Sequence, residues 1–197
     1  MTALATRRAL GTGAVLLAGV LALAWAWRAP GLAPAAAPPA EPAERAGEAA
    51  PPTQLLQRQV REHPRDGRAW ALLGYAELEA ARYPEAAAAF ERAVEASPKV
   101  ALDPAVWCAW ADALGMAQGG SLDGRPSELI AQALKLQPAH PQALEMAGSA
   151  AYGRRDFRAA LQYWQRLLPQ LQAGTQPHEE LTRAIARTER LAATSLR

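Results

Sequence analysis

Residues 67–98 decide the fold of this chain, and their sequence is GRAWALLGYAELEAARYPEAAAAFERAVEASP. A bulky anchor at Trp70 is followed four residues later by Gly74, and a second anchor, Phe90, lies beyond Pro84. Proline is tolerated in the first turn of a helix, because its missing N–H group would have no partner there in any case. The pattern predicts two antiparallel helices, and the glycine would let their backbones approach closely.

The same pattern recurs twice towards the C-terminus. When the chain is aligned on Pro64, Pro98 and Pro138, which are 34 and 40 residues apart, three columns of matching residues appear. The columns are Trp70, Trp107 and Leu144; Gly74, Ala111 and Gly148; and Phe90, Ile130 and Trp164. Two helices per repeat, with a small residue at their closest approach, are typical of the tetratricopeptide repeat (TPR).

We therefore predict an all-α fold, a TPR solenoid of three helix pairs with flanking N- and C-terminal helices. The repeats are expected over about residues 67–98, 104–138 and 141–172, within a TPR domain that spans 53–197. The helices are expected over about 54–62, 67–80, 84–96, 104–116, 126–136, 141–153, 157–171 and 177–193. The last helix would cap the solenoid, and the aromatic anchors Trp70, Phe90, Trp107, Trp110 and Trp164 would lie in the core.

The N-terminal residues predict one transmembrane helix. Residues 9–27 carry no charge, and a helix of that length just crosses a hydrocarbon layer about 30 Å thick. Because Arg7 and Arg8 precede this stretch, the positive-inside rule places residues 1–8 in the cytoplasm and exports the rest. A cleaved signal peptide is the alternative, since Ala24-Trp25-Ala26 has small residues at the required spacing. The arginine pair alone is only a weak sign of twin-arginine export.

Residues 28–52 predict a linker between this span and the repeats. The stretch holds seven prolines among many alanines. Proline removes backbone donors and fixes φ, so we expect an extended, semi-rigid tether without packed elements.

Composition argues against several classes of function. With 21 basic and 19 acidic residues the formal net charge is +2, which gives no reason to expect nucleic-acid binding. The single cysteine, Cys108, cannot form an internal disulfide, and the lack of any CxxC or Cys/His cluster argues against zinc, thioredoxin-type chemistry and covalent haem. His63, His140 and His178 each neighbour a proline, with no catalytic partner at a suitable spacing. We predict no enzyme activity, no metal and no cofactor.

The first helix of each repeat predicts a peptide-binding groove. In a TPR solenoid, positions 2, 5, 9 and 12 of these helices face the concave side. These positions hold Arg68, Ala71, Tyr75 and Leu78; Ala105, Cys108, Asp112 and Gly115; and Gln142, Glu145, Ser149 and Tyr152, with Met116 one position further on. Such a surface suits an amphipathic helix with a few basic residues, and the two tyrosines favour binding over an ordinary solvated face.

Residues 154–158 contain a small basic cluster, Arg154, Arg155 and Arg158, at the turn of the third repeat. Most such clusters are solvated, but this one could also meet anionic lipid or a partner subunit.

The second half of the chain resembles a known family. The motifs that carry the resemblance are Ala111-Asp112-Ala113-Leu114, Gly124-Arg125-Pro126, Leu134-x-Leu136-x-Pro138-x-His140-Pro141-x-Ala143-Leu144, Ala147-Gly148-x-Ala150-Ala151-Tyr152 and Tyr163-Trp164-x-x-Leu167-Leu168. Together with the extended loop of the second repeat, they resemble the periplasmic TPR domain of bacterial c-type cytochrome biogenesis proteins. The resemblance covers about residues 54–191.

This resemblance implies a subunit of the haem lyase apparatus. Such a protein would bind the C-terminal helix of an apocytochrome c, present it to the haem lyase membrane subunits, and be held to the bacterial inner membrane by its N-terminal helix, with the TPR domain in the periplasm. With one predicted span in place of two, the chain is closer to the short NrfG-like form than to the longer CycH type. The alternative hypothesis is a general cell-envelope TPR scaffold for another protein complex.

Overall fold

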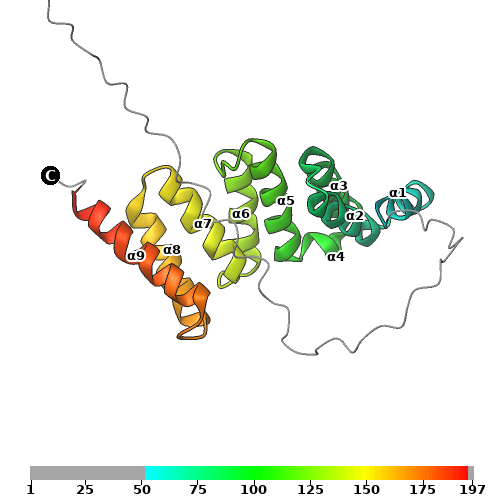
Figure 1. The fold of residues 1–197 in the computed structure, drawn as a ribbon. Helices are drawn as coiled ribbons and strands as arrows, with labels where there is room; N and C mark the ends of the chain where they lie inside the picture. Colours follow the sequence, from blue (N-terminus) through cyan, green and yellow to red (C-terminus); the bar gives the residue numbers. More distant parts are fainter. Residues whose placement is uncertain (1–51, 195–197) are drawn as a thin grey trace, which may run out of the picture. The chain divides into compact units, whose positions relative to one another are not determined.

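The computed structural model describes residues 52–194, which are helical with short connections and contain no strand (Figure 1). The elements are α1 (Pro52–Glu62), α2 (Gly67–Glu79), α3 (Tyr83–Ala96), α4 (Pro98–Ala101), α5 (Pro104–Ala117), α6 (Arg125–Leu136), α7 (Pro141–Gly153), α8 (Phe157–Leu167), the 3₁₀ helix η2 (Leu168–Gln170) and α9 (Gln176–Thr194). The predicted all-α class is confirmed for this part of the chain.

The predicted transmembrane helix over residues 9–27 lies outside the described residues, as does the predicted linker over 28–52 apart from its last residue. Between residues 52 and 194, every helix is too short or too polar to cross a membrane.

The helices pack as consecutive pairs. α2 packs against α3, α5 against α6, and α7 against α8, while α3 also contacts α5 and α6 contacts α7. The second helix of each pair therefore rests on the first helix of the next pair. The first helices also contact one another directly, α2 with α5 and α5 with α7. The three first helices thus lie side by side, in the order in which Figure 1 shows them along the chain.

The close approaches predicted within each pair are present. A Cβ atom added to Gly74 would lie 2.8 Å from the ring of Phe90, and one added to Gly148 would overlap the indole of Trp164. In the second pair the matching residues, Ala111 and Ile130, are both buried. Small residues therefore set the distance between the helices of each pair.

The aromatic anchors divide into two groups. Phe90, Trp110 and Trp164 are buried, as predicted. Trp70 and Trp107 are only partly buried, and each indole N–H donates to a backbone carbonyl six residues earlier, at 3.0 Å and 2.8 Å. A buried indole commonly finds such a partner, and here the bond ties each first helix to the connection that precedes it.

The first helix of each pair ends in the same kind of turn. After α2, two successive backbone N–H groups donate to carbonyls of the last helical turn, at 3.0 and 2.9 Å, and matching bonds follow α5 and α7. The first N–H donor of each turn has positive φ: Ala81 at 56°, Gly119 at 76° and Arg155 at 62°. In the second turn the next residue, Gly120, also has positive φ, 88°. Left-handed backbone costs a residue with a side chain about 1–2 kcal/mol, so the first and third turns are strained.

Two details differ from the helices expected from the sequence. The connection before α5 contains a short helix, α4, in which the N–H of Val100 donates to the hydroxyl of Ser97 at 3.4 Å and the valine side chain is buried. The helix predicted over 157–171 ends at Leu167 and continues as η2. Pro169 has no N–H to donate to a carbonyl four residues earlier, so the chain tightens into a 3₁₀ turn.

The terminal helices cover the ends of the repeats. Val60 of α1 is buried against α2 and α3, and the buried carboxylate of Glu77 accepts a hydrogen bond from Gln57 at 3.0 Å and another from Arg82. At the other end, Leu181 and Ile185 of α9 join the apolar cluster that contains Trp164. Without these two helices the apolar sides of the outer pairs would face water.

Replacing Ala81 by glycine should stabilise the protein. Glycine adopts a positive φ without a steric penalty, whereas alanine at φ 56° does not. We expect the free energy of unfolding of Ala81→Gly to rise by about 0.5–1 kcal/mol in urea titrations followed by circular dichroism. Ala80→Gly is the matched control, because Ala80 has φ −82° and should lose stability with glycine. Equal effects at both positions would contradict the strain assigned to Ala81.

Replacing Gly148 by alanine should destabilise the third helix pair. The added Cβ would overlap the indole of Trp164, so the indole or its helix would have to move. Overpacking of this kind costs about 1–3 kcal/mol of unfolding free energy, measured as above. Gly153→Ala in the same helix is the control, because nothing lies within 4 Å of its added Cβ. If Gly148→Ala were as stable as the wild type, the close approach would not limit the packing.

Candidate peptide-binding face

The exposed side of α2 has an apolar centre. The side chains of Arg68, Leu72, Tyr75 and Glu79 follow one another at helical spacing, and all four are exposed, Leu72 by 56% and Tyr75 by 37%. Leu72 was missed by the sequence-based prediction, which used only positions 2, 5, 9 and 12 of the helix. Leu72 follows Arg68 by four residues and precedes Tyr75 by three, and this helical spacing was the signal that could have placed it on the same side of α2. Ala71, which was assigned to the groove, is buried.

The two tyrosines assigned to the groove are both held by the core of their own helix pair. Tyr75 meets the ring of Phe90 edge to face, with 5.0 Å between ring centroids. Tyr152 lies 5.7 Å from the rings of both Phe157 and Trp164, measured between centroids. Each tyrosine is therefore oriented by buried aromatic packing while part of it stays in contact with solvent.

Two carboxylates lie half-buried on the neighbouring helices. Asp112 of α5 and Glu145 of α7 have neither a hydrogen bond nor an ion pair to any residue between 52 and 194. Burial raises the pKa of the Asp112 carboxyl and also the pKa of the Glu145 carboxyl. Both groups have lost water without gaining a partner within the described chain, which makes their charged forms costly.

The remaining predicted groove residues vary in exposure. Gln142 is exposed, while Leu78, Ala105, Met116 and Ser149 are half-buried. Gly115 is buried beneath the loop that follows α5, because a Cβ added there would lie 2.9 Å from the side chain of Leu122. We use the name inner face for a set of ten accessible side chains on α2, α5 and α7. They are Arg68, Leu72, Tyr75, Glu79, Asp112, Met116, Gln142, Glu145, Ser149 and Tyr152.

Cys108 does not line this face. Its side chain is 0% exposed and packs with Ala133 and Ala143, so a bound peptide could not touch it. The structure therefore corrects its assignment to the groove, because position 5 of α5 is covered by the start of α7. Burial, followed by the nearby charges of Asp103 and Asp112, raises the pKa of the Cys108 thiol to about 12. A thiol in this state is not a nucleophile at neutral pH.

His140 lies beside this cysteine, although the sequence showed only that it neighbours a proline. Its Nδ1 atom accepts the N–H of Ala143 at 3.3 Å, which caps α7, and lies 3.8 Å from the sulfur of Cys108. Because that nitrogen accepts, the ring proton is assigned to Nε2 and the thiol can donate to Nδ1. Burial lowers the pKa of His140, while Asp103 acts in the opposite direction.

Asp103 connects these groups electrostatically. Its carboxylate caps α5 by accepting the N–H of Ala105 at 2.9 Å. Burial, and then the charge of Asp103, raises the pKa of Tyr75. The start of α5, the start of α7 and the middle of α2 therefore lie close to one another. Within residues 52–194 no group of three acidic, histidine or cysteine side chains could hold a metal ion.

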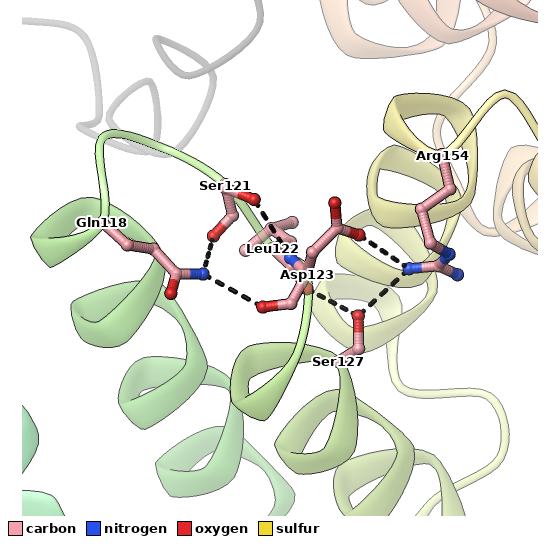
Figure 2. Close-up of polar contacts among 6 residues, drawn as sticks. All are labelled: Gln118, Ser121, Leu122, Asp123, Ser127 and Arg154. Atoms are coloured by element: carbon pink, nitrogen blue, oxygen red, sulfur yellow. Dashed lines mark hydrogen bonds and ion pairs between the residues drawn. The ribbon is translucent and has the colours of Figure 1, made fainter.

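The extended loop between α5 and α6 is fixed by its own polar groups (Figure 2). The side-chain amide of Gln118 donates to the carbonyls of Ser121 and Asp123, at 2.6 and 3.1 Å. The N–H of Asp123 donates to the hydroxyl of Ser121 at 3.3 Å. A loop with three glycines of positive φ thus has a defined conformation.

The same loop is tied to the next repeat. The Arg154 guanidinium, at the end of α7, donates to the Asp123 carboxylate at 3.3 Å and to the Ser127 hydroxyl at 3.1 Å. Ser127 in turn donates to the carbonyl of Leu122 at 2.5 Å. Arg154, one of the three arginines in the basic cluster, therefore links the second and third repeats.

Comparison with known proteins agrees with this architecture. Residues 53–177 match the family described as the cytochrome c-type biogenesis protein H TPR domain. The chain is also similar to the cytochrome c-type biogenesis protein CycH of Pseudomonas aeruginosa, with 33% identity over 132 residues. The matched region covers 67% of this chain and 30% of that protein, so the chain spans less than a third of the relative's length. Because the family match includes well over half of its residues, this chain belongs to the TPR family of cytochrome c-type biogenesis proteins.

Proposed function

We propose that this protein is a membrane-anchored periplasmic TPR protein of c-type cytochrome maturation, which binds the C-terminal helix of an apocytochrome c on its inner face and presents it to the haem lyase complex. Membership of the family supports the role in maturation. The observation that carries the binding proposal is the pair of half-buried carboxylates, Asp112 and Glu145, which have no partner between residues 52 and 194 and lie on α5 and α7, in line with the exposed Leu72 and Tyr75 of α2.

Charge on the inner face differs in sign from that of the chain. The residues of the inner face that are charged at neutral pH are one basic residue, Arg68, and three acidic ones, Glu79, Asp112 and Glu145. Their formal charge is −2, whereas the chain as a whole carries +2. This local excess of negative charge favours a basic partner and would speed its approach.

Apolar groups on the same face would contact the partner's apolar stripe. Leu72 and Tyr75 lie on α2, Met116 on α5 and Tyr152 on α7. An amphipathic helix laid across three adjacent helices would bury these side chains and place basic residues near Asp112 and Glu145. Since the two carboxylates are already partly desolvated, a bound cation would gain more from them than from fully hydrated ones.

The proposed positions of the membrane span and the linker follow from the sequence. The predicted span over residues 9–27 would hold the protein at the inner membrane, and the proline-rich segment over 28–52 would separate the repeats from it. The haem lyase membrane subunits are the proposed recipients of the bound client.

Removing the two carboxylate charges should weaken client binding. We expect Asp112→Asn combined with Glu145→Gln to reduce the affinity for an apocytochrome C-terminal peptide about five- to thirtyfold, or about 1–2 kcal/mol. The affinity is measured by calorimetry with the full chain. Glu95→Gln is the control, because this exposed glutamate lies on α3 and pairs with Arg92. Unchanged affinity would refute binding at the inner face. No binding at all, with normal c-type cytochromes in a deletion strain, would favour the scaffold hypothesis.

Client binding should also weaken as the pH falls. A bound cation favours the charged carboxylates, so protonation of Asp112 and Glu145 opposes binding. Because burial raises both pKa values, the loss should begin at a higher pH than for ordinary carboxyl groups. The stability of the free protein should change in the opposite direction, since an acid with a raised folded-state pKa gains stability as the pH falls through that pKa.

The double variant provides the reference for this pH dependence. Calorimetric titrations at several pH values should show a smaller loss of affinity for Asp112→Asn with Glu145→Gln than for the wild type. His140→Asn is a second control, because His140 gains positive charge at low pH and would also repel a basic peptide, while asparagine can still cap α7. A wild-type affinity that does not vary with pH would contradict the role of the two carboxylates.

A further inference from the structure

A small hollow lies between α6, α7 and α8, and it shares no residue with the inner face. Its polar lining includes Ser127 and Arg154, and the rest of the lining is Ile130, Ala131, Leu134, Ala147, Ala150 and Tyr163. The hollow measures about 60 Å³, well below the roughly 150 Å³ that accommodates a benzene ring. It therefore favours a small aliphatic side chain over an aromatic one.

The guanidinium beside this hollow is held in place. A single nitrogen of Arg154, Nη1, makes both of its contacts, to Asp123 and to Ser127, as Figure 2 shows. Its Nε and Nη2 atoms have no hydrogen-bond partner among residues 52–194. An arginine fixed in this way keeps donors available for a carboxylate, and little side-chain entropy remains to be lost when the carboxylate binds.

Further positive charge lies next to Arg154. Arg155 and Arg158 are exposed and form no ion pair within the described chain. The acidic residue between them, Asp156, caps α8 by accepting the N–H of Ala159 at 3.0 Å and keeps its negative charge. With Asp123 and Asp156 counted, these three arginines and two aspartates have a formal charge of +1, which favours an acidic ligand beside Arg154.

We propose that this hollow is a second docking surface, which binds an acidic segment of a partner protein. One small aliphatic side chain of the segment fills the hollow, and a nearby Asp or Glu carboxylate pairs with Arg154. A protein segment fits better than a lipid headgroup, because a headgroup has no branched apolar group to occupy the lining. Since the surface is separate from the inner face, a client helix and this partner could be bound together.

The test uses two short peptides and the full chain in a neutral detergent. The probe is acetyl-Ala-Glu-Val-Glu-Ala-amide, and the reference peptide has glutamine in place of both glutamates. In ¹⁵N spectra of the protein we expect the probe to shift the amide signals of Ser127, Ala147 and Ala150, and to leave those of Tyr75 and Asp112 unchanged. Shifts confined to the inner face would overturn the proposal.

Two variants test the contribution of the Arg154 charge and that of the hollow separately. Arg154→Gln should weaken probe binding at least about fivefold. The glutamine peptide should bind the wild type with the same loss of affinity, and Arg154→Gln should not weaken its binding further. Ala131→Leu should abolish binding, because this exposed residue lines the hollow and leucine would fill it. Ala88→Leu, at an exposed position of α3, is the matched control. Unfolding curves check that each variant keeps its stability.

Two further results would overturn the proposal. The first is unchanged probe affinity in both Arg154→Gln and Ala131→Leu. The second is the same set of amide shifts produced by vesicles of phosphatidylcholine and phosphatidylglycerol, together with no shift from the probe, which would assign the surface to an anionic membrane.

Discussion

The structure depends on the contact between a small residue in the first helix of each pair and a large side chain in the second. Gly74 lies against Phe90 and Gly148 against Trp164 so closely that a Cβ atom would not fit. This contact limits rotation of the first helix about its axis, because rotation would bring a larger residue against the ring. The side chains that point to the inner face are thereby fixed as well.

Aromatic packing carries this constraint to the inner face. Tyr75 rests on Phe90, and Tyr152 lies against Trp164, the same two rings that meet the glycines. The two tyrosines are thus held by the core, and the binding proposed for this face would need little reorganisation of them. Asp112 and Glu145 add a different contribution, because the folded chain keeps two carboxylates in partly desolvated positions where charge is costly. Such a cost is understandable at a binding surface, where a partner's cation would offset it.

α7 contributes to both proposed surfaces through different sides of one helix. Glu145, Ser149 and Tyr152 belong to the inner face, while Ala147 and Ala150 line the hollow with α6 and α8. Arg154, at the end of the same helix, joins the hollow to the loop between α5 and α6. That loop distinguishes the second repeat in sequence, and in the folded chain it connects two repeats and positions an arginine.

The sequence by itself determined the helix pairs, because proline positions and the spacing of small and large residues are local signals that helical geometry converts into packing. It also identified the family, and it placed Asp112 and Glu145 on the accessible side of their helices. Only the tertiary structure decided that Cys108 is covered, that His140 lies beside it from 32 residues away, and that Arg154 pairs with Asp123. These contacts depend on how successive pairs stack, and the periodicity of a single helix contains no information about which residues of the next repeat will cover it.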